Sequence, residues 1–216
     1  MLKVNAKAGE IFIYDTIGQD WFGGGITASN IISALDQLDG KRATVRINSP
    51  GGVADEGIAI YNALKRYEGG VDTVVDALAA SAASVIALAG ESRITSAGGR
   101  WMIHRALALA VGNAIDMRKT ADILDTYDRS LVEIYKGPLG KEDDEILQLM
   151  SDETWYTADE AIAAGLSTGK GGSTEAQARV ASWFKHPPQS MLNLDVAKLE
   201  PKPYPVARQA AKVLSI

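Results

Sequence analysis

Strand-like and helix-like segments alternate along the first half of the chain, with glycine-containing turns between them. Residues 10–15 (E-I-F-I-Y-D) are rich in β-branched and aromatic types and predict a strand, and residues 27–38 carry apolar side chains at helical spacing. The same order returns with a strand at 43–47 and a helix at 54–67. Strands that alternate with helices of this length favour βαβ units, which build a largely parallel sheet with right-handed crossovers. We therefore expect an α/β fold.

The alternation continues to about residue 104 and then gives way to a long helix. Residues 72–76 and 101–104 predict further strands, with a helix at 81–89 between them. Residues 113–136 then predict one long polar helix with a narrow apolar stripe, which we expect Gly137-Pro138 to terminate. A stripe of that kind indicates a packing seam, either within the chain or between subunits.

Composition near the C-terminus indicates a domain boundary. The run G-K-G-G-S at residues 169–173 is typical of a flexible linker, so we assign residues 1–168 to one domain. The remaining tail, residues 174–216, is interrupted by five prolines and is too short to build its own core. We expect this tail to dock on a partner or to be mobile.

Several classes of function are disfavoured by composition. The 216 residues include no cysteine, which excludes thiol catalysis, disulfides and cysteine-ligated zinc. The two histidines, His104 and His186, are too few for a histidine-rich metal site, and we expect neither a metal nor a cofactor. A net charge of -5 argues against a nucleic-acid partner. No stretch approaches the ~20 apolar residues of a membrane span, and no signal peptide is evident, so we expect a cytoplasmic protein without a membrane partner.

Two serines lie in an alanine-rich stretch at residues 76–90, and one of them is a candidate nucleophile. Ser81 falls where the strand ending near Asp76 gives way to a helix, so the backbone amides and the helix dipole favour negative charge beside it. Ser84 lies one turn further along, where we expect it to pack inside the protein. By composition alone the stretch also fits a tightly packed helix with two satisfied hydroxyl groups.

A serine nucleophile needs a base, an acid that orients the base, and backbone N–H groups for the oxyanion. His104 is the one histidine inside the predicted domain, although a lone histidine at the end of an apolar strand is more often structural. The turn after the strand at 43–47 contains the pair Gly51-Gly52, whose amides are suitable oxyanion donors. The candidate acids are Asp152 and Glu153, in a loop position where charged residues are usually solvated.

Together these segments resemble the ClpP family of serine peptidases. Four blocks carry the resemblance in the family's order and spacing: I-N-S-P-G-G-V at 47–53, A-A-S-A-A-S-V-I-A-L-A-G at 79–90, M-I-H at 102–104 and A-D-E-A-I-A-A-G-L at 158–166. The chain is most similar to the ClpP-related head maturation proteases of phages and prophages, through I-F-I-Y-D-T-I-G near the start and E-T-W-Y-T-A-D-E-A near the end.

The resemblance implies a role for each candidate residue. The family's nucleophile falls on Ser81 and its base on His104. The family's glycine pair falls on Gly51 and Gly52, and the amide of Ala82 becomes the second oxyanion donor. The family's aspartate aligns with Glu153, one methylene longer, so either the loop accommodates the glutamate or Asp152 takes the role. A further departure is Ala82-Ala83, where the family often has methionine and glycine.

The resemblance also implies an architecture and a function. We expect a ClpP/crotonase-like fold of repeated βαβ units, in which the helix at 113–136 is the handle that interdigitates between two rings of a homo-oligomer. The expected activity is that of a serine endopeptidase on polypeptide substrates, with phage scaffold or capsid proteins as partners in head maturation, in the host cytoplasm. The alternatives are a catalytically inactive ClpP-like shell and, less favoured, a crotonase-type acyl-CoA enzyme.

Overall fold

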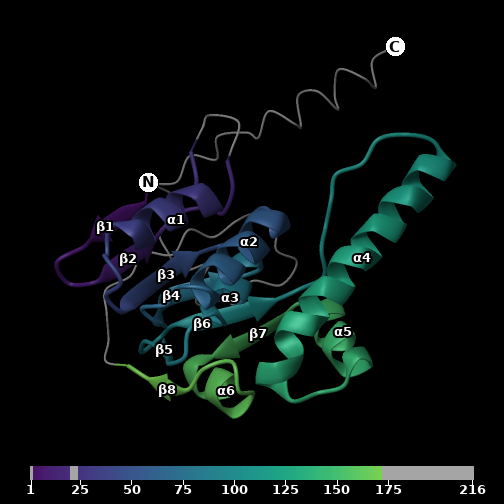
Figure 1. The fold of residues 1–216 in the computed structure, drawn as a ribbon. Coiled ribbons are helices and arrows are strands. Elements are labelled where there is room, and N and C mark those ends of the chain that lie inside the picture. The colour runs from purple at the N-terminus through teal and green to yellow at the C-terminus, as the bar shows by residue number, and fades with distance from the viewer. Residues whose placement is uncertain (1, 20–23, 172–216) are drawn as a thin grey trace, which may run out of the picture. The chain divides into compact units, whose positions relative to one another are not determined.

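The structure is a computed structural model that describes residues 2–19 and 24–171. The strands are β1 (Lys3–Asn5), β2 (Glu10–Ile13), β3 (Ala43–Ser49), β4 (Val71–Ala80), β5 (Arg93–Thr95), β6 (Arg100–Ile103), β7 (Thr154–Thr157) and β8 (Gly169–Lys170). The helices are α1 (Ala28–Asp36), α2 (Ala54–Lys65), α3 (Ala82–Ala87), α4 (Ala114–Leu139), α5 (Asp143–Ser151) and α6 (Ala158–Ala163). Strands and helices alternate as the sequence predicts, which confirms the α/β fold with a long helix (Figure 1).

The sheet is mostly parallel. Its order is β1-β2-β3-β4-β5-β8, and the pairs β2/β3, β3/β4, β4/β5 and β5/β8 all run parallel. The two antiparallel pairs are β1/β2 and β6/β7. Neither β1 nor β7 was predicted, since each is only three or four residues long and is defined by its neighbour in the sheet.

The long strand β4 pairs with two different strands on the same edge. Its first part lies beside β5, with Val75 opposite Thr95, and its last part lies beside β6, with Ala80 opposite Met102. The predicted strand at 72–76 was therefore too short, because β4 continues through Ala79 and Ala80 to the residue before Ser81. Small, weakly strand-forming alanines are held in the sheet here by tertiary packing rather than by propensity.

Helices α1, α2 and α3 pack against one another in order along the chain, and α3 packs on β3 and β4. The core contains isoleucine, leucine and valine side chains from the sheet and these helices, together with Trp101 of β6 and Tyr135 of α4. Along β3 and the first part of β4, buried and half-buried residues alternate, so one face of this part of the sheet is fully covered. In the part of the chain that the structure describes, no helix has the length and apolar character needed to cross a membrane.

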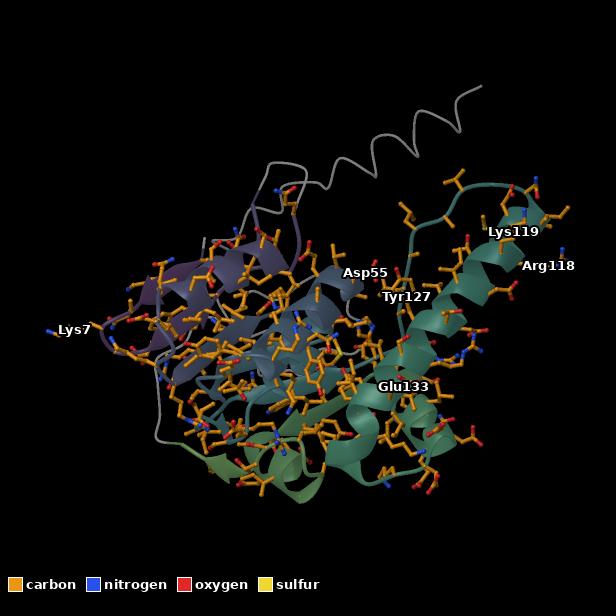
Figure 2. The ribbon with its side chains drawn as sticks, in the orientation of Figure 1. Lys7, Asp55, Arg118, Lys119, Tyr127 and Glu133 are labelled. Carbon is orange, nitrogen blue, oxygen red and sulfur yellow. The ribbon has the colours of Figure 1, made fainter. Side chains whose placement is uncertain are left out.

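The long helix α4 extends further than the sequence indicates. Gly137 and Pro138 do not end it; the helix runs through both to Leu139, and Gly140 follows in the left-handed conformation. Pro138 lies in the last turn of α4, where it removes one backbone hydrogen bond of the helix. The first half of α4 projects away from the sheet, with Arg118 and Lys119 near its distal end, while its second half packs on α3 and α5 (Figures 1 and 2).

Part of the predicted linker belongs to the sheet. Gly169 and Lys170 form β8, which pairs with β5 through Ile94 and Thr95. The rest of the predicted linker beyond residue 171 and the tail at 174–216, with His186, lie outside the described residues. The assignment of these segments as linker and tail stays a prediction.

Candidate active site

The sheet topology brings Ser81 and His104 to the same edge. Ala80, the last residue of β4, is opposite Met102 of β6 in this parallel pair. Ser81 directly follows Ala80, and His104 comes two residues after Met102. The backbone N–H of Ser81 donates to the carbonyl of Met102 at 2.9 Å. Ligand crevices of open parallel sheets lie at this carboxyl edge of the strands.

The backbone at Ser81 adopts an unusual conformation. Its φ of 53° and ψ of -128° fall outside the regions that non-glycine residues normally occupy, and Ser81 is directly followed by α3. A conformation of this kind costs about 1–3 kcal/mol and persists only where the surroundings hold it. A serine on a strained turn from strand to helix is the arrangement of a nucleophile elbow, which exposes the hydroxyl above the sheet.

Ser84 has a structural position, as the sequence predicts. Its side chain is fully buried, and its Oγ donates to the Ser81 carbonyl at 2.6 Å and contacts the Tyr135 hydroxyl at 2.6 Å. The Ser84 backbone N–H donates to the same Ser81 carbonyl at 2.9 Å. Two hydrogen bonds from one residue therefore hold the turn that presents Ser81.

The imidazole of His104 contacts the Ser81 hydroxyl directly. The distance between His104 Nε2 and Ser81 Oγ is 2.7 Å, and His104 is half-buried at the end of β6. This distance is within the range in which a base takes the proton of a nucleophile. The structure thus joins the two side chains that the sequence places 23 positions apart.

Of the two candidate acids, Glu153 is buried at the end of the β6/β7 pair, whereas Asp152 is exposed. Thr154 is opposite Ile103 in the antiparallel pair β6/β7, so Glu153 and His104 are the residues that directly adjoin the end of this pair on its two strands. The Glu153 residue is only 6% exposed and has a φ of 53°. Asp152 is exposed, and its Oδ1 accepts a hydrogen bond from Gln148 at 2.8 Å.

The glycine turn after β3 packs directly against the Ser81 turn. A Cβ atom added at Gly51 would lie 2.5 Å from the Ala80 carbonyl oxygen and 2.7 Å from Ser81 Cβ, and the φ of Gly51 is 90°. No side chain fits at this position. The register shift in β3 between Ile47 and Ser49 brings the turn to this place.

The three predicted oxyanion donors are not equivalent. The Gly51 N–H already donates to Ser49 Oγ at 3.1 Å. Ala82 is the first residue of α3, so its N–H has no acceptor within the helix. Within the described part of the chain the Gly52 N–H likewise has no acceptor. Gly52 and Ala82 are therefore the donors that remain for an oxyanion.

Sequence reasoning missed four groups around the site. Trp155 donates to Glu153 Oε1 at 3.4 Å, and the carbonyl of Met150 accepts hydrogen bonds from both Arg105 and Glu153. The other two are Asp128 and Tyr135 of α4. Their segments are far apart in sequence, and no local pattern marks them. Across residues 2–19 and 24–171, no group of three or more His, Asp or Glu side chains is arranged to hold a metal ion.

A serine on a strand-to-helix turn, in contact with a histidine and close to the N–H groups of Gly52 and Ala82, is an arrangement typical of serine hydrolases. The family follows from comparison with known proteins. The model of the Clp protease family matches residues 3–168. The chain belongs to the Clp protease family.

Relatives in bacteria agree with this family. The chain is 35% identical over 164 residues to the "ATP-dependent Clp protease proteolytic subunit 1" of Protochlamydia amoebophila, covering 72% of this chain and 77% of the relative. It is 38% identical over 152 residues to the protein of the same name from Chlamydia abortus, covering 66% and 79%. Among solved structures, a mutant of ClpP1 from Listeria monocytogenes shares the fold, with a TM-score of 0.67 at 21% identity, covering 79% of this chain and 94% of that one.

Proposed function

We propose that this protein is a serine endopeptidase in which Ser81 is the nucleophile, His104 the base and Glu153 the orienting acid. The single observation that carries the proposal is the 2.7 Å contact between His104 Nε2 and Ser81 Oγ at the strained turn after β4. The register of β6 and β7 and the burial of Glu153 favour it over Asp152 as the acid. The backbone N–H groups of Gly52 and Ala82 bind the oxyanion.

The reaction follows acyl-enzyme chemistry. Ser81 Oγ attacks the carbonyl carbon of the scissile peptide bond while His104 Nε2 takes the hydroxyl proton. His104 then gives this proton to the amine nitrogen as the C–N bond breaks. A water molecule attacks the acyl-enzyme and transfers its proton to His104, and Ser81 leaves as the free hydroxyl when His104 returns that proton. The products are a new carboxyl terminus and a new amine.

The protein acts as a homo-oligomeric ring in which α4 is the handle. Exposed apolar side chains on α4 and on the segment before it support this assignment, since large apolar side chains gathered in one region mark contact surfaces. They are Leu107, Leu109, Val111, Ile115 and Ile123, each more than half exposed. In such an assembly the substrates are polypeptides that enter an enclosed chamber.

We infer a role in phage or prophage head maturation, in the host cytoplasm, with scaffold or capsid proteins as substrates. Its support is the similarity of residues 11–18 and 153–161 to that branch of the family. The second candidate role is the proteolytic subunit of an ATP-dependent protease, which the names of the bacterial relatives favour. The two roles differ in one outcome: a proteolytic subunit needs an ATPase partner to degrade a folded protein, whereas a maturation protease cuts its structural substrates without ATP.

Labelling with a serine-directed fluorophosphonate tests the activity. The wild-type protein should be labelled at Ser81, and the label should be absent from Ser81→Ala, with Ser33→Ala, at an exposed position of α1, as the matched serine control that keeps it. Labelling that survives Ser81→Ala refutes the assignment. Assembly into rings without labelling and without cleavage of casein would instead support the inactive shell, and acyl-CoA binding by calorimetry would support a crotonase-type enzyme.

A further inference from the structure

Two buried polar side chains of α4 contact residues close to the proposed catalytic pair: Asp128 the Ala106 N–H, and Tyr135 the Ser84 hydroxyl. Asp128 is 3% exposed and Tyr135 is 1% exposed, whereas most polar residues of α4 face solvent. The two are seven residues apart, two helical turns, and so lie on the same face of the helix. This face packs toward the sheet edge that carries Ser81 and His104.

Asp128 holds the two residues that directly follow His104. Its Oδ1 accepts a hydrogen bond from the Ala106 N–H at 2.8 Å, and its Oδ2 is 2.9 Å from Arg105 Nε. The Arg105 N–H donates to the Met150 carbonyl at 3.2 Å, the same carbonyl that accepts from the Glu153 N–H. The chain leaving His104 is therefore held from one side by α4 and from the other by the end of α5.

A buried carboxylate is costly unless it is paired and hydrogen-bonded, so its contacts indicate what keeps it there. Both oxygens of Asp128 are used on residues 105 and 106, and none of these bonds stabilises α4 itself. Beyond Ala106 the chain becomes exposed, since Leu107 is 56% and Leu109 is 74% exposed. Asp128 thus fixes the two residues between His104 and the exposed segment. Without these contacts His104 would be free to move with that segment.

Tyr135 acts on Ser81, the other residue of the proposed catalytic pair, through Ser84. The one hydroxyl hydrogen of Ser84 goes to the Ser81 carbonyl, so the Tyr135 hydroxyl is the donor in its 2.6 Å contact with Ser84 Oγ. Burial raises the pKa of Tyr135, which keeps the hydroxyl protonated and able to donate. Tyr135 thereby orients the side chain that fixes the Ser81 turn.

We propose that Asp128 and Tyr135 are positioning residues, through which α4 holds His104 and Ser81 within hydrogen-bond distance of each other. The catalytic meaning of this role rests on the proposed function. Neither side chain contacts the reacting atoms. Their contribution is geometric, because a displacement of about 1 Å in a catalytic group lowers the rate about 100-fold.

The test compares Asp128→Leu with Asp128→Asn, and Asp125→Asn serves as the matched control on an exposed position of the same helix. The measurement is the rate of fluorophosphonate labelling as a function of pH, taken well below the melting temperature of each variant. Asn keeps an acceptor for the Ala106 N–H and loses only a partly exposed ion pair, so its maximal rate should stay within about threefold of wild type. Leu removes both contacts, so its maximal rate should fall at least about tenfold.

The pH midpoint separates a positioning role from a purely structural one. The charged residues around His104 are Arg105, which follows it in the chain, Asp128 of α4, which pairs with Arg105, and Glu153, which precedes β7. In Asp128→Leu the Arg105 guanidinium loses its counter-charge, which disfavours the imidazolium, so the midpoint should move to lower pH. Tyr135→Phe, which leaves these charges in place, should lower the maximal rate without moving the midpoint. A lowered melting temperature with unchanged rate and midpoint in Asp128→Leu would overturn the proposal.

Crystal structures decide the proposal independently of activity. In Asp128→Leu the distance between His104 Nε2 and Ser81 Oγ should open beyond hydrogen-bond range, with residues 105 and 106 displaced. If the distance stays at its wild-type value, Asp128 does not position His104. If wild type is not labelled at Ser81, the proposed function fails, and the same distance still settles the positioning role.

Discussion

Replacement of Glu153 and of its neighbour Asp152 by their amides separates the two candidate acids. Glu153→Gln keeps the size of the side chain and removes its charge, so imidazolium at His104 loses its stabilising partner. Asp152→Asn makes the equivalent change one residue earlier, at the C-terminal end of α5. The two substitutions are therefore chemically matched and differ only in location.

The structure predicts a large decrease in the labelling rate for Glu153→Gln and almost none for Asp152→Asn. Glu153 is 6% exposed and adjoins the last pair of the β6/β7 register, Ile103 and Thr154, next to His104. Loss of the orienting acid of a serine triad lowers kcat by about 10⁴-fold, so we expect Glu153→Gln to label at least ~10³-fold more slowly. Asp152 is exposed and contacts Gln148 of its own helix, a pair worth no more than about 0.5 kcal/mol, so its amide should be within twofold of wild type.

The assay is the second-order rate of fluorophosphonate labelling at pH 8, followed by intact mass so that each modified Ser81 is counted. Glu153→Asp retains the charge with a shorter reach, and its rate should lie between those of wild type and Glu153→Gln. Thermal melting of each variant checks that the fold persists. A slow Asp152→Asn beside a normal Glu153→Gln would refute the assignment of the acid and the register reasoning behind it.

Three further predictions concern the scaffold around the site. Gly51→Ala should lower the free energy of unfolding by about 2–4 kcal/mol in chemical denaturation, because its Cβ would clash with Ser81 and the backbone φ is 90°. An unchanged denaturation curve with full labelling would contradict this prediction. Thr157→Ala removes the N-cap of α6 and should cost about 1 kcal/mol, whereas Thr157→Ser should restore most of it in the same assay. Burial and the hydrogen bond to Asp76 raise the pKa of Tyr14 to about 12. The stability that this hydroxyl contributes is complete below pH ~10, the pKa of tyrosine in the unfolded chain, and is lost as the pH rises from there to about 12. The difference in urea midpoint between wild type and Tyr14→Phe should therefore shrink over that interval. A difference that stays constant would show that the pairing is absent.

Local patterns account for most of the elements. Apolar periodicity and glycine turns predict β2, β3, α1 and α2 closely, because each buries a continuous face that its own sequence defines. The T-x-x-E box likewise predicts the start of α6, where Thr157 accepts from the Glu160 N–H and the Glu160 side chain from the Thr157 N–H. Short strands such as β7 escape prediction, since they exist through pairing with a distant strand.

The end of α4 shows where a strong local rule fails. Gly137-Pro138 predicts a stop after residue 136, yet the helix continues through both residues to Leu139 and closes at Gly140. The carbonyl of Pro138 lies so close to Gly165 that a Cβ there would be 2.1 Å from it, and this contact holds the last turn of α4 against the segment after α6. Packing against a distant glycine outweighs the local preference of proline.

The sequence by itself determined the α/β class and made Ser81, His104 and the glycine turn the candidate residues, because these depend on residue type and on order along the chain. Only the tertiary structure distinguishes the two candidate acids: Asp152 and Glu153 are chemically similar neighbours, and the pairing of β7 with β6 leaves Glu153 buried and Asp152 exposed, which is the basis for proposing Glu153. It also brings Asp128 and Tyr135 of α4 into contact with Ala106 and Ser84, residues that no local spacing relates to α4, because packing rather than sequence order joins them.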